Sequence, residues 1–188
     1  MHNPVEITEL WTALRKGDKG AFNSLTILFY PTLYNYGTKL TRDYTLVEDC
    51  IQDLFLDLWR RRLYLGETEH VKFYLLKSLR RKVYAERKSK DKWLLQDWEH
   101  ADMTEFNGEF SAESMIIESE SAEINIRKLQ QVLGSLSKRQ REAIYLKFYQ
   151  EMDNEQISKM MSINYQSVRN LVHTAIKALQ DAWFTGKE

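Results

Sequence analysis

Apolar side chains recur three or four positions apart along almost the whole chain, and this spacing constrains the fold more than any other feature. The pattern runs from Ile7 to about Lys92 and resumes from Ile126 to Trp183. In the first stretch it falls on Leu10, Leu14, Phe22, Leu25, Leu28, Phe29, Leu33 and Leu40. Such a period indicates helices that each bury one face. Only two prolines and seven glycines among 188 residues leave little material for the frequent turns of a β-sandwich. The sequence therefore predicts an all-α protein.

The formal net charge of zero hides three regions of different charge. Residues 1–92 carry 17 Lys and Arg against 12 Asp and Glu, residues 93–126 carry none against 9, and residues 127–188 carry 10 against 6. The middle region also has weaker periodicity and many small or polar residues, as a linker does. We therefore expect two small helical domains, 1–92 and 126–188, joined by an acidic flexible linker over 93–125. Basic domains of this kind attract nucleic acid.

Several classes of protein are disfavoured by what the sequence lacks. No run approaches the ~18 apolar residues of a membrane span, and the first ten residues lack the pattern of a signal peptide, so we expect a cytoplasmic protein. Cys50 is the only cysteine and the four histidines are far apart, which argues against a disulfide or a metal site. There is no glycine-rich phosphate loop and no nucleophile with a companion base nearby. We therefore expect no catalytic residues, no cofactor, no metal and no small-molecule substrate.

The second domain contains the pattern of a helix-turn-helix. Asp153 can cap a helix while Gln156, three positions later, completes a capping box. That helix should end near Met161, and after a short turn the next helix should begin at Asn164 or Tyr165. Two short helices across a turn of about three to four residues form the helix-turn-helix motif.

The second helix of this motif divides into an apolar and a polar face. Its apolar side chains should pack against Ile157, Met160 and the preceding helix around residues 143–148; they are Val168, Leu171, Val172, Ala175, Ile176 and Leu179. The polar face carries Gln166, Arg169, Asn170, His173 and Lys177. Arg and Lys can bond guanine and Asn and Gln can bond adenine in the major groove. A polar face can also be merely solvated, but this one has no acidic residue from Tyr165 to Gln180.

A second candidate surface lies on the segment VEDCIQDLFLDLWRRR, residues 47–62, which is predicted to be a helix. Its buried stripe should be Val47, Ile51, Leu54, Phe55 and Leu58. Leu56 and Trp59 fall outside the stripe, beside Asp49 and Gln52. Large apolar groups mixed with polar ones are typical of a protein-binding patch. The alternative is that a neighbouring helix of the bundle covers this face.

A third candidate surface is the basic stretch at residues 72–92. It holds nine Lys and Arg against two acidic residues, with Phe73, Tyr74 and Tyr84 interleaved. Aromatic rings beside cations can hold unpaired bases and their phosphates. The alternative is a solvated helix face, and the helical spacing of the aromatics favours contact with nucleic acid.

These segments resemble a known family. VEDCIQDLFLDLWRRR is similar to the region-two signature of extracytoplasmic-function sigma factors of bacterial RNA polymerase, a group within the sigma-70 family. FYLL at 73–76 and the Arg-rich helix follow it as in that family, and the segment from Leu133 to Gln180 resembles region four. The resemblance implies an alternative sigma factor that binds core RNA polymerase and directs it to specific promoters. It also implies an anti-sigma factor, often membrane-bound, as a partner.

The resemblance assigns a role to each candidate surface. It places contact with core polymerase on Asp49, Gln52, Phe55, Leu56 and Trp59. It places the downstream promoter element on Lys77, Arg80, Arg81, Tyr84 and Lys88. It places the upstream promoter element on Gln166, Ser167, Arg169, Asn170, His173 and Lys177.

Three other functions remain open from the sequence alone. A dimeric helix-turn-helix transcriptional regulator would explain residues 127–183 but not the basic aromatic helix or the face at Leu56 and Trp59. A helical enzyme is a weaker rival, because the motifs of catalysis are missing. A protein-interaction adaptor would be favoured by an absence of salt-sensitive DNA binding.

Overall fold

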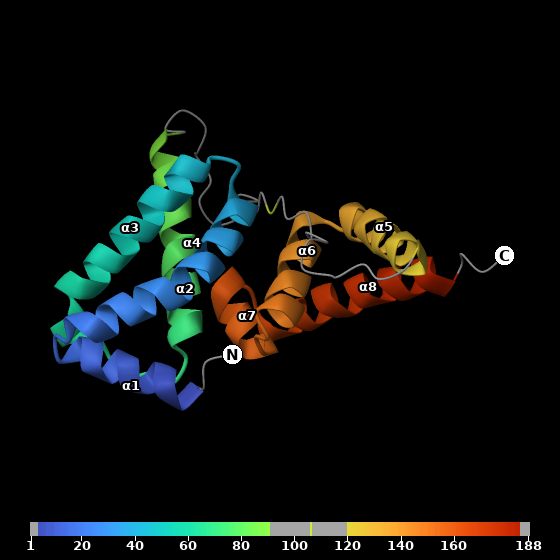
Figure 1. Ribbon diagram of the computed structural model, residues 1–188. Helices are drawn as coiled ribbons and strands as arrows, with labels where there is room; N and C mark the ends of the chain where they lie inside the picture. Colours follow the sequence, from blue (N-terminus) through green and yellow to red (C-terminus); the bar gives the residue numbers. More distant parts are fainter. Residues whose placement is uncertain (1–3, 91–105, 107–119, 185–188) are drawn as a thin grey trace. The chain divides into compact units, whose positions relative to one another are not determined.

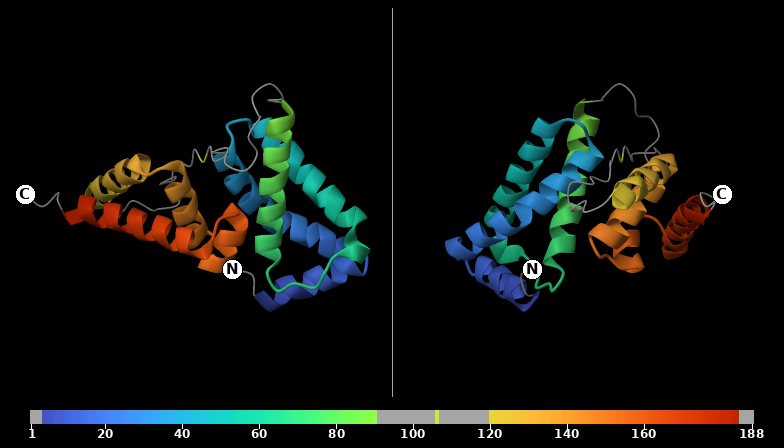
Figure 2. Two further views of the ribbon diagram at one scale, coloured as in Figure 1. Left: turned by 180° about the vertical axis from the view of Figure 1, so that it is seen from behind. Right: turned by 45° about the vertical axis from the view of Figure 1, so that its right-hand side comes forward.

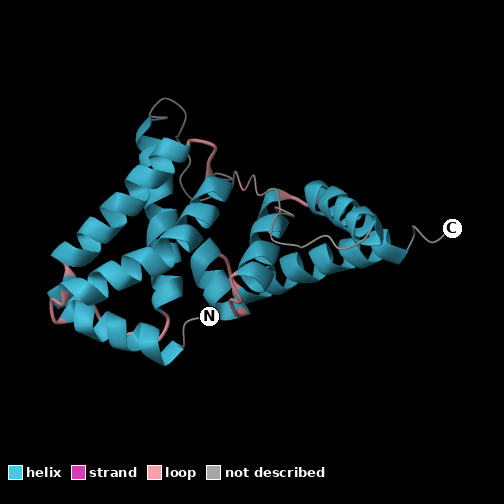
Figure 3. Ribbon diagram, viewed as in Figure 1, coloured by secondary structure: helices cyan, strands magenta, loops and turns pink. Residues whose placement is uncertain are grey.

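The structure is a computed structural model and describes residues 4–90, 106 and 120–184. Within these residues every regular element is a helix, and there is no strand (Figure 3). The prediction of an all-α protein is therefore confirmed. The chain divides into two compact units, Met1–Met103 and Thr104–Glu188, which we describe separately. Most of the linker expected over 93–125 lies outside the described residues, and a helix begins at Glu120, within the last six residues of that range.

The first unit contains four helices and one 3-10 turn (Figure 1). In chain order they are α1 (Pro4–Arg15), α2 (Lys19–Leu40), α3 (Tyr44–Arg60), η1 (Arg62–Tyr64) and α4 (Val71–Lys90). Asp18 caps α2 by accepting from the Ala21 amide at 2.8 Å, and Asp43 caps α3 by accepting from the Leu46 amide at 3.0 Å. These side chains satisfy amides that the first helical turn leaves without a partner.

Helices α2, α3 and α4 pack on one another around a single apolar core. All five residues of the predicted stripe of α3 are buried: Val47, Ile51, Leu54, Phe55 and Leu58. Gly37 of α2 lies so close to α3 that a Cβ there would come within 2.5 Å of Val47. The close crossing of α2 and α3 therefore depends on a residue without a side chain.

The second unit contains α5 (Glu120–Ser135), α6 (Lys138–Ile144), η3 (Tyr145–Tyr149), α7 (Asn154–Met161) and α8 (Tyr165–Phe184). The predicted capping box is present: Asp153 Oδ1 accepts from the Gln156 amide at 2.7 Å, and Gln156 Oε1 accepts from the Asp153 amide at 3.1 Å. Helix α7 ends at Met161 as expected, and Ser162 follows it in the left-handed conformation. The helix-turn-helix is thereby confirmed.

The segment before α7 differs from the expectation in one respect. Residues 145–149 form a turn of π-helix, and there Tyr145 and Leu146 are buried while the Phe148 side chain is 57% exposed. A π-helix turns more slowly per residue than an α-helix, so the later side chains of the segment move off the buried face. The preceding helix packs against α8 as predicted, and Ala143 to Leu146 are buried, whereas Phe148 at the end of the expected segment is largely exposed.

Candidate functional site

The polar face of α8 is presented to solvent in the second unit. The exposed side chains include Gln166, Arg169, Asn170, His173 and Lys177, while Ser167 is half-buried. Val168, Val172 and Ala175 are buried on the opposite side, where α8 packs on α6 and α7. Leu171, Ile176 and Leu179 are half-buried at the boundary between the two faces. The structure thus brings five of the six predicted upstream-element residues onto one open helix face.

The start of α8 is fixed by its own sequence. Asn164 Oδ1 accepts a hydrogen bond from the Ser167 amide at 2.7 Å, and so caps the helix. Two residues earlier, Ser162 ends α7 with a positive φ of 56°. Its neighbour Ile163 donates its amide to the Ser158 carbonyl at 3.1 Å. These contacts set the angle between α7 and α8, and a defined angle allows the second helix to enter a groove while the first lies across it.

The predicted protein-binding patch on α3 is only partly open. Asp49 and Gln52 are exposed, and the Leu56 side chain is 49% exposed. Phe55 is buried, with its ring 6.2 Å from that of Phe22 in an edge-on arrangement. Of the residues assigned to polymerase contact, Phe55 therefore lies in the core below the patch and not on its surface.

Trp59 shows that both interpretations of this face hold in part. Its ring lies 5.1 Å from the ring of Phe22, which belongs to α2, and the Arg62 guanidinium lies 4.4 Å from its centroid. Arg62 Nη1 also donates to the Trp59 carbonyl at 2.7 Å. A neighbouring helix thus covers part of Trp59 but leaves Leu56 open to solvent.

The basic helix α4 pairs its cations with aromatic rings. The Arg80 guanidinium lies 4.6 Å from the centroid of the Tyr84 ring, and the Lys77 ammonium lies 5.6 Å from that of Phe73. Arg81 is exposed, whereas Lys77, Arg80, Tyr84 and Lys88 are half-buried. Rings flanked by guanidinium and ammonium groups can stack a base while the cations bind its phosphate.

Two other cations of α4 contact the neighbouring helices. Lys82 Nζ lies 2.6 Å from Asp57 Oδ2 of α3, and Arg87 Nη1 donates to the carbonyl of Leu40, the last residue of α2, at 3.1 Å. Both side chains belong to the basic stretch at residues 72–92, and the sequence alone does not distinguish them from the candidate DNA contacts. Their partners are 25 and 47 positions away in sequence, so only the fold identifies them.

Helical periodicity does not identify every exposed apolar side chain. Leu63 and Tyr64 in the turn after α3 are 72% and 87% exposed. They follow Arg60, Arg61 and Arg62, and a helical period cannot single them out because they lie outside a long helix. The sequence signal that could have identified Leu63 and Tyr64 is their position directly after three arginines.

The two titratable groups whose pKa values change most are buried in the cores of the two units. Burial raises the pKa of the Cys50 thiol to about 11, so this thiol stays protonated near neutral pH and is a poor nucleophile. Burial also raises the pKa of Tyr145 to about 12, and its hydroxyl oxygen accepts from Gln150 Nε2 at 2.9 Å. Within the described part of the chain, no group of His, Cys, Asp and Glu side chains could hold a metal ion.

No helix in the described residues is long and apolar enough to cross a bilayer.

Comparison with known proteins finds similarity to sigma factors. Residues 126–179 match the family of sigma-70 region 4. Over 183 residues the chain is 26% identical to the ECF RNA polymerase sigma factor SigK of Mycobacterium sp. (strain JLS), covering 95% of this chain and 92% of that protein. The SigK of Mycobacterium sp. (strain KMS) is also 26% identical over the same shares of both chains.

Two solved structures share the fold. One is CnrH in complex with the cytosolic domain of CnrY, with a TM-score of 0.57 and 16% identity over 96% of this chain and 98% of that one. The other is the sigma factor RpoE in complex with the anti-sigma factor NepR from Bartonella quintana. Its TM-score is 0.55, with 18% identity over 86% of this chain and 96% of that one.

Proposed function

We propose that the chain is an alternative sigma factor of the extracytoplasmic-function group in the sigma-70 family. It binds core RNA polymerase and directs it to specific promoters for the initiation of transcription. The observation that carries this function is the exposed face of α8, which lies inside the matched region and combines Arg, Asn and Gln side chains with no acidic residue. The similarity to a sigma factor over 95% of this chain, which includes α3 and α4, favours a sigma factor over a dimeric regulator.

The second unit recognises the upstream promoter element. In this proposal Gln166, Arg169 and Asn170 contact base edges in the major groove, as amide and guanidinium groups do. Ser167, His173 and Lys177 flank them and contact the phosphate backbone, which positions the helix.

The first unit contributes the other two contacts. Asp49, Gln52, Leu56 and the exposed part of Trp59 bind core polymerase, and Phe55 supports this patch from the core below it. Lys77, Arg80, Arg81, Tyr84 and Lys88 on α4 bind the downstream element, where stacking on Tyr84 suits a base that has left the duplex.

The domain limits of this proposal are 1–92, 93–125 and 126–188. Two modest DNA contacts joined by a linker gain avidity when the linker length fits the distance between the two elements. Because the linker length must fit, we expect the two promoter elements to lie at a fixed spacing.

The remaining parts of the proposal follow from the family. An anti-sigma factor holds the chain inactive, as the solved complexes of CnrH with CnrY and of RpoE with NepR suggest by analogy. The chain acts in the cytoplasm, where polymerase and DNA are, and contributes binding energy without a catalytic site of its own.

The test is transcription by purified core RNA polymerase from a library of random promoter fragments, with and without this chain. We expect the chain to select transcripts with defined start sites and two conserved sequence elements. Binding to duplex DNA without any transcript from added polymerase would contradict the proposal and favour a dimeric regulator.

A further inference from the structure

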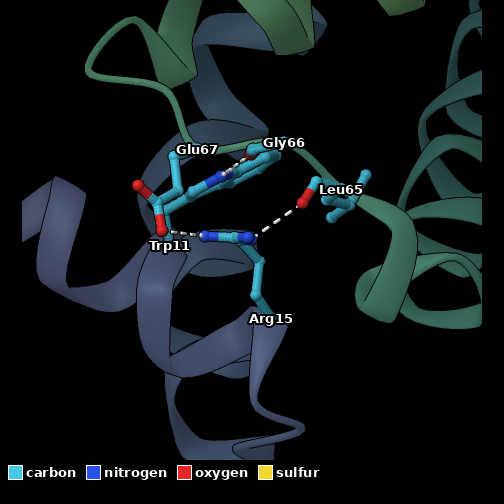
Figure 4. A network of polar contacts seen from close by, with 5 residues as sticks. All are labelled: Trp11, Arg15, Leu65, Gly66 and Glu67. Atoms are coloured by element: carbon cyan, nitrogen blue, oxygen red, sulfur yellow. Dashed lines mark hydrogen bonds and ion pairs between the residues drawn. The ribbon is translucent and has the colours of Figure 1, made fainter.

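Helix α1 holds the connection between α3 and α4 through two polar side chains (Figure 4). Arg15 Nε donates to the Leu65 carbonyl at 2.8 Å, and Trp11 Nε1 donates to the Gly66 carbonyl at 3.0 Å. Arg15 Nη1 also lies 3.0 Å from Glu67 Oε1. We call Trp11 and Arg15, with the two carbonyls that they bind, the α1 anchor.

The two backbone contacts of the anchor are better protected from water than its ion pair. Trp11 is 1% exposed and the Arg15 side chain is 26% exposed, whereas the Glu67 side chain is 85% exposed. A hydrogen bond from a charged group to a partly buried carbonyl contributes more than an exposed ion pair, because water competes less for a partly buried acceptor. The anchor therefore depends on the N–H donors of Trp11 and Arg15 rather than on Glu67.

The anchor reaches α4 as well as the connection before it. The ring of Trp11 lies 5.3 Å from the ring of Tyr74 in the first turn of α4, in an edge-on arrangement. Both views in Figure 2 show α1 crossing the end of the bundle where α4 begins. Lys77 is one turn beyond Tyr74, and Arg80 follows on the next turn. One buried indole thus contacts both the connection and the helix that carries the proposed DNA side chains.

The length of the connection does not itself require support from a third helix. Residues 61–70 join two helices that already pack along their lengths, through the buried stripe of α3 and the Lys82–Asp57 ion pair. A connection of this length would reach between them without side chains from a third helix. What the anchor adds is a defined position for the α3–α4 connection and for the first turns of α4.

We infer that Trp11 and Arg15 are positioning residues for promoter recognition: they fix the α3–α4 connection and the first turns of α4 in the position that the downstream element requires. This inference rests on the proposed sigma function and adds to it a role for α1, which contains none of the proposed contact residues. Polymerase capture through α3 and upstream recognition through α8 do not depend on the anchor.

Three substitutions in the full-length chain test the anchor. Arg15→Lys keeps the charge but removes the planar guanidinium, which binds Leu65 and Glu67 at once. Trp11→Phe keeps an aromatic ring against Tyr74 but removes the donor to Gly66. Glu67→Gln is the matched control, because it removes only the exposed ion pair.

The measurements use core RNA polymerase and the library of promoter fragments described above. We expect Arg15→Lys and Trp11→Phe to lower promoter-dependent transcription about five- to tenfold, the range that one or two net hydrogen bonds supply. Sequence preference should relax at the downstream element and stay unchanged at the upstream element. Affinity for core polymerase should remain within about twofold of the wild type, and Glu67→Gln should behave as the wild type.

Amide hydrogen exchange on the free chain supplies a second, independent readout. We expect faster exchange in residues 62–74 of Arg15→Lys and Trp11→Phe, with unchanged protection in α2 and α3. Faster exchange throughout the first unit would mean that these residues only stabilise the fold, and would overturn the inference.

Two transcription results would also overturn it. One is an unchanged preference at the downstream element despite faster local exchange, and the other is a loss of polymerase affinity equal to the loss of transcription. A wild-type chain that captures no polymerase would instead refute the proposed sigma function, and the anchor's promoter role with it. The wild-type measurement thus distinguishes the two failures.

Discussion

Gln166 Nε2 donates a hydrogen bond to Asn170 Oδ1 at 3.0 Å on the exposed surface of α8, one helical turn apart. The contact leaves the Asn170 amide nitrogen and the Gln166 carbonyl oxygen for other partners. These are a donor and an acceptor, the pair of groups that an adenine edge requires in the major groove. The two side chains are therefore oriented by each other before any DNA is present.

Arg169 lies between these two amides in sequence and is exposed beside them. We expect Arg169→Ala to weaken binding of the upstream element by about 1–3 kcal/mol if the guanidinium bonds a guanine. The measurement is the affinity of the polymerase-bound chain for the selected promoter and for versions altered at single upstream positions. Gln180→Ala, an exposed change near the other end of α8, is the control and should have no effect. An equal loss on every sequence would assign Arg169 to a phosphate.

Leu56 separates polymerase binding from stability better than Trp59 does. We expect Leu56→Ala to reduce affinity for core polymerase about fivefold, since burying the exposed half of a Leu side chain at an interface contributes about 1 kcal/mol. Its effect on the free energy of unfolding should stay within about 0.5 kcal/mol, because half of the side chain already faces solvent. Trp59→Ala should lower both quantities, because its ring also packs on Phe22.

The control for Leu56 is Val5→Ala, which shortens an exposed apolar side chain on α1. It should leave the affinity for polymerase unchanged. A wild-type affinity for Leu56→Ala would remove this residue from the interface.

Glu151 has a φ of 57°, in the left-handed region where a side chain costs about 1–2 kcal/mol. Glu151→Gly should therefore raise the free energy of unfolding by up to about 1 kcal/mol, after the larger unfolded-state entropy of glycine is subtracted. Chemical denaturation of the full-length chain measures the change. Glu151→Ala keeps a Cβ in the same backbone conformation and should give no comparable gain. Equal stabilisation by both substitutions would point to the loss of the charge and not to relief of strain.

Asp57 should make the stability of the first unit depend on pH. The hydrogen bond from Lys82 holds the pKa of this carboxyl below its ordinary value of 3.8. A lowered folded pKa means that the stabilisation is present above the ordinary pKa and is lost as the pH falls through the folded one. Because Asp57 is half exposed, we expect Asp57→Asn to cost only about 0.5 kcal/mol at pH 7. The difference from the wild type should shrink below pH 3.8, and a constant difference down to the folded pKa would contradict the assignment.

The helices and their buried faces could be predicted from the sequence because both depend on local spacing. The stripe of α3, the capping box of Asp153 and Gln156 and the polar face of α8 all follow from residues within a few turns of each other. Phe148 could not be placed, because the π-helical turn that exposes it interrupts the 3.6-residue period on which the prediction depends.

Contacts between residues far apart in the chain could not be predicted from the sequence either. The partial cover of Trp59 by Phe22 and the two structural cations of α4 require knowledge of which helices are neighbours. The α1 anchor joins residues 50 and 55 positions apart, and neither Trp11 nor Arg15 differs by spacing from an ordinary helix residue.

The most direct test of the central claim is equilibrium binding of this full-length chain to purified core RNA polymerase, with Leu56→Ala and Val5→Ala measured beside it. The sigma function predicts a stable one-to-one complex that Leu56→Ala weakens and Val5→Ala does not. A chain that binds duplex DNA but forms no complex with core polymerase would contradict the account.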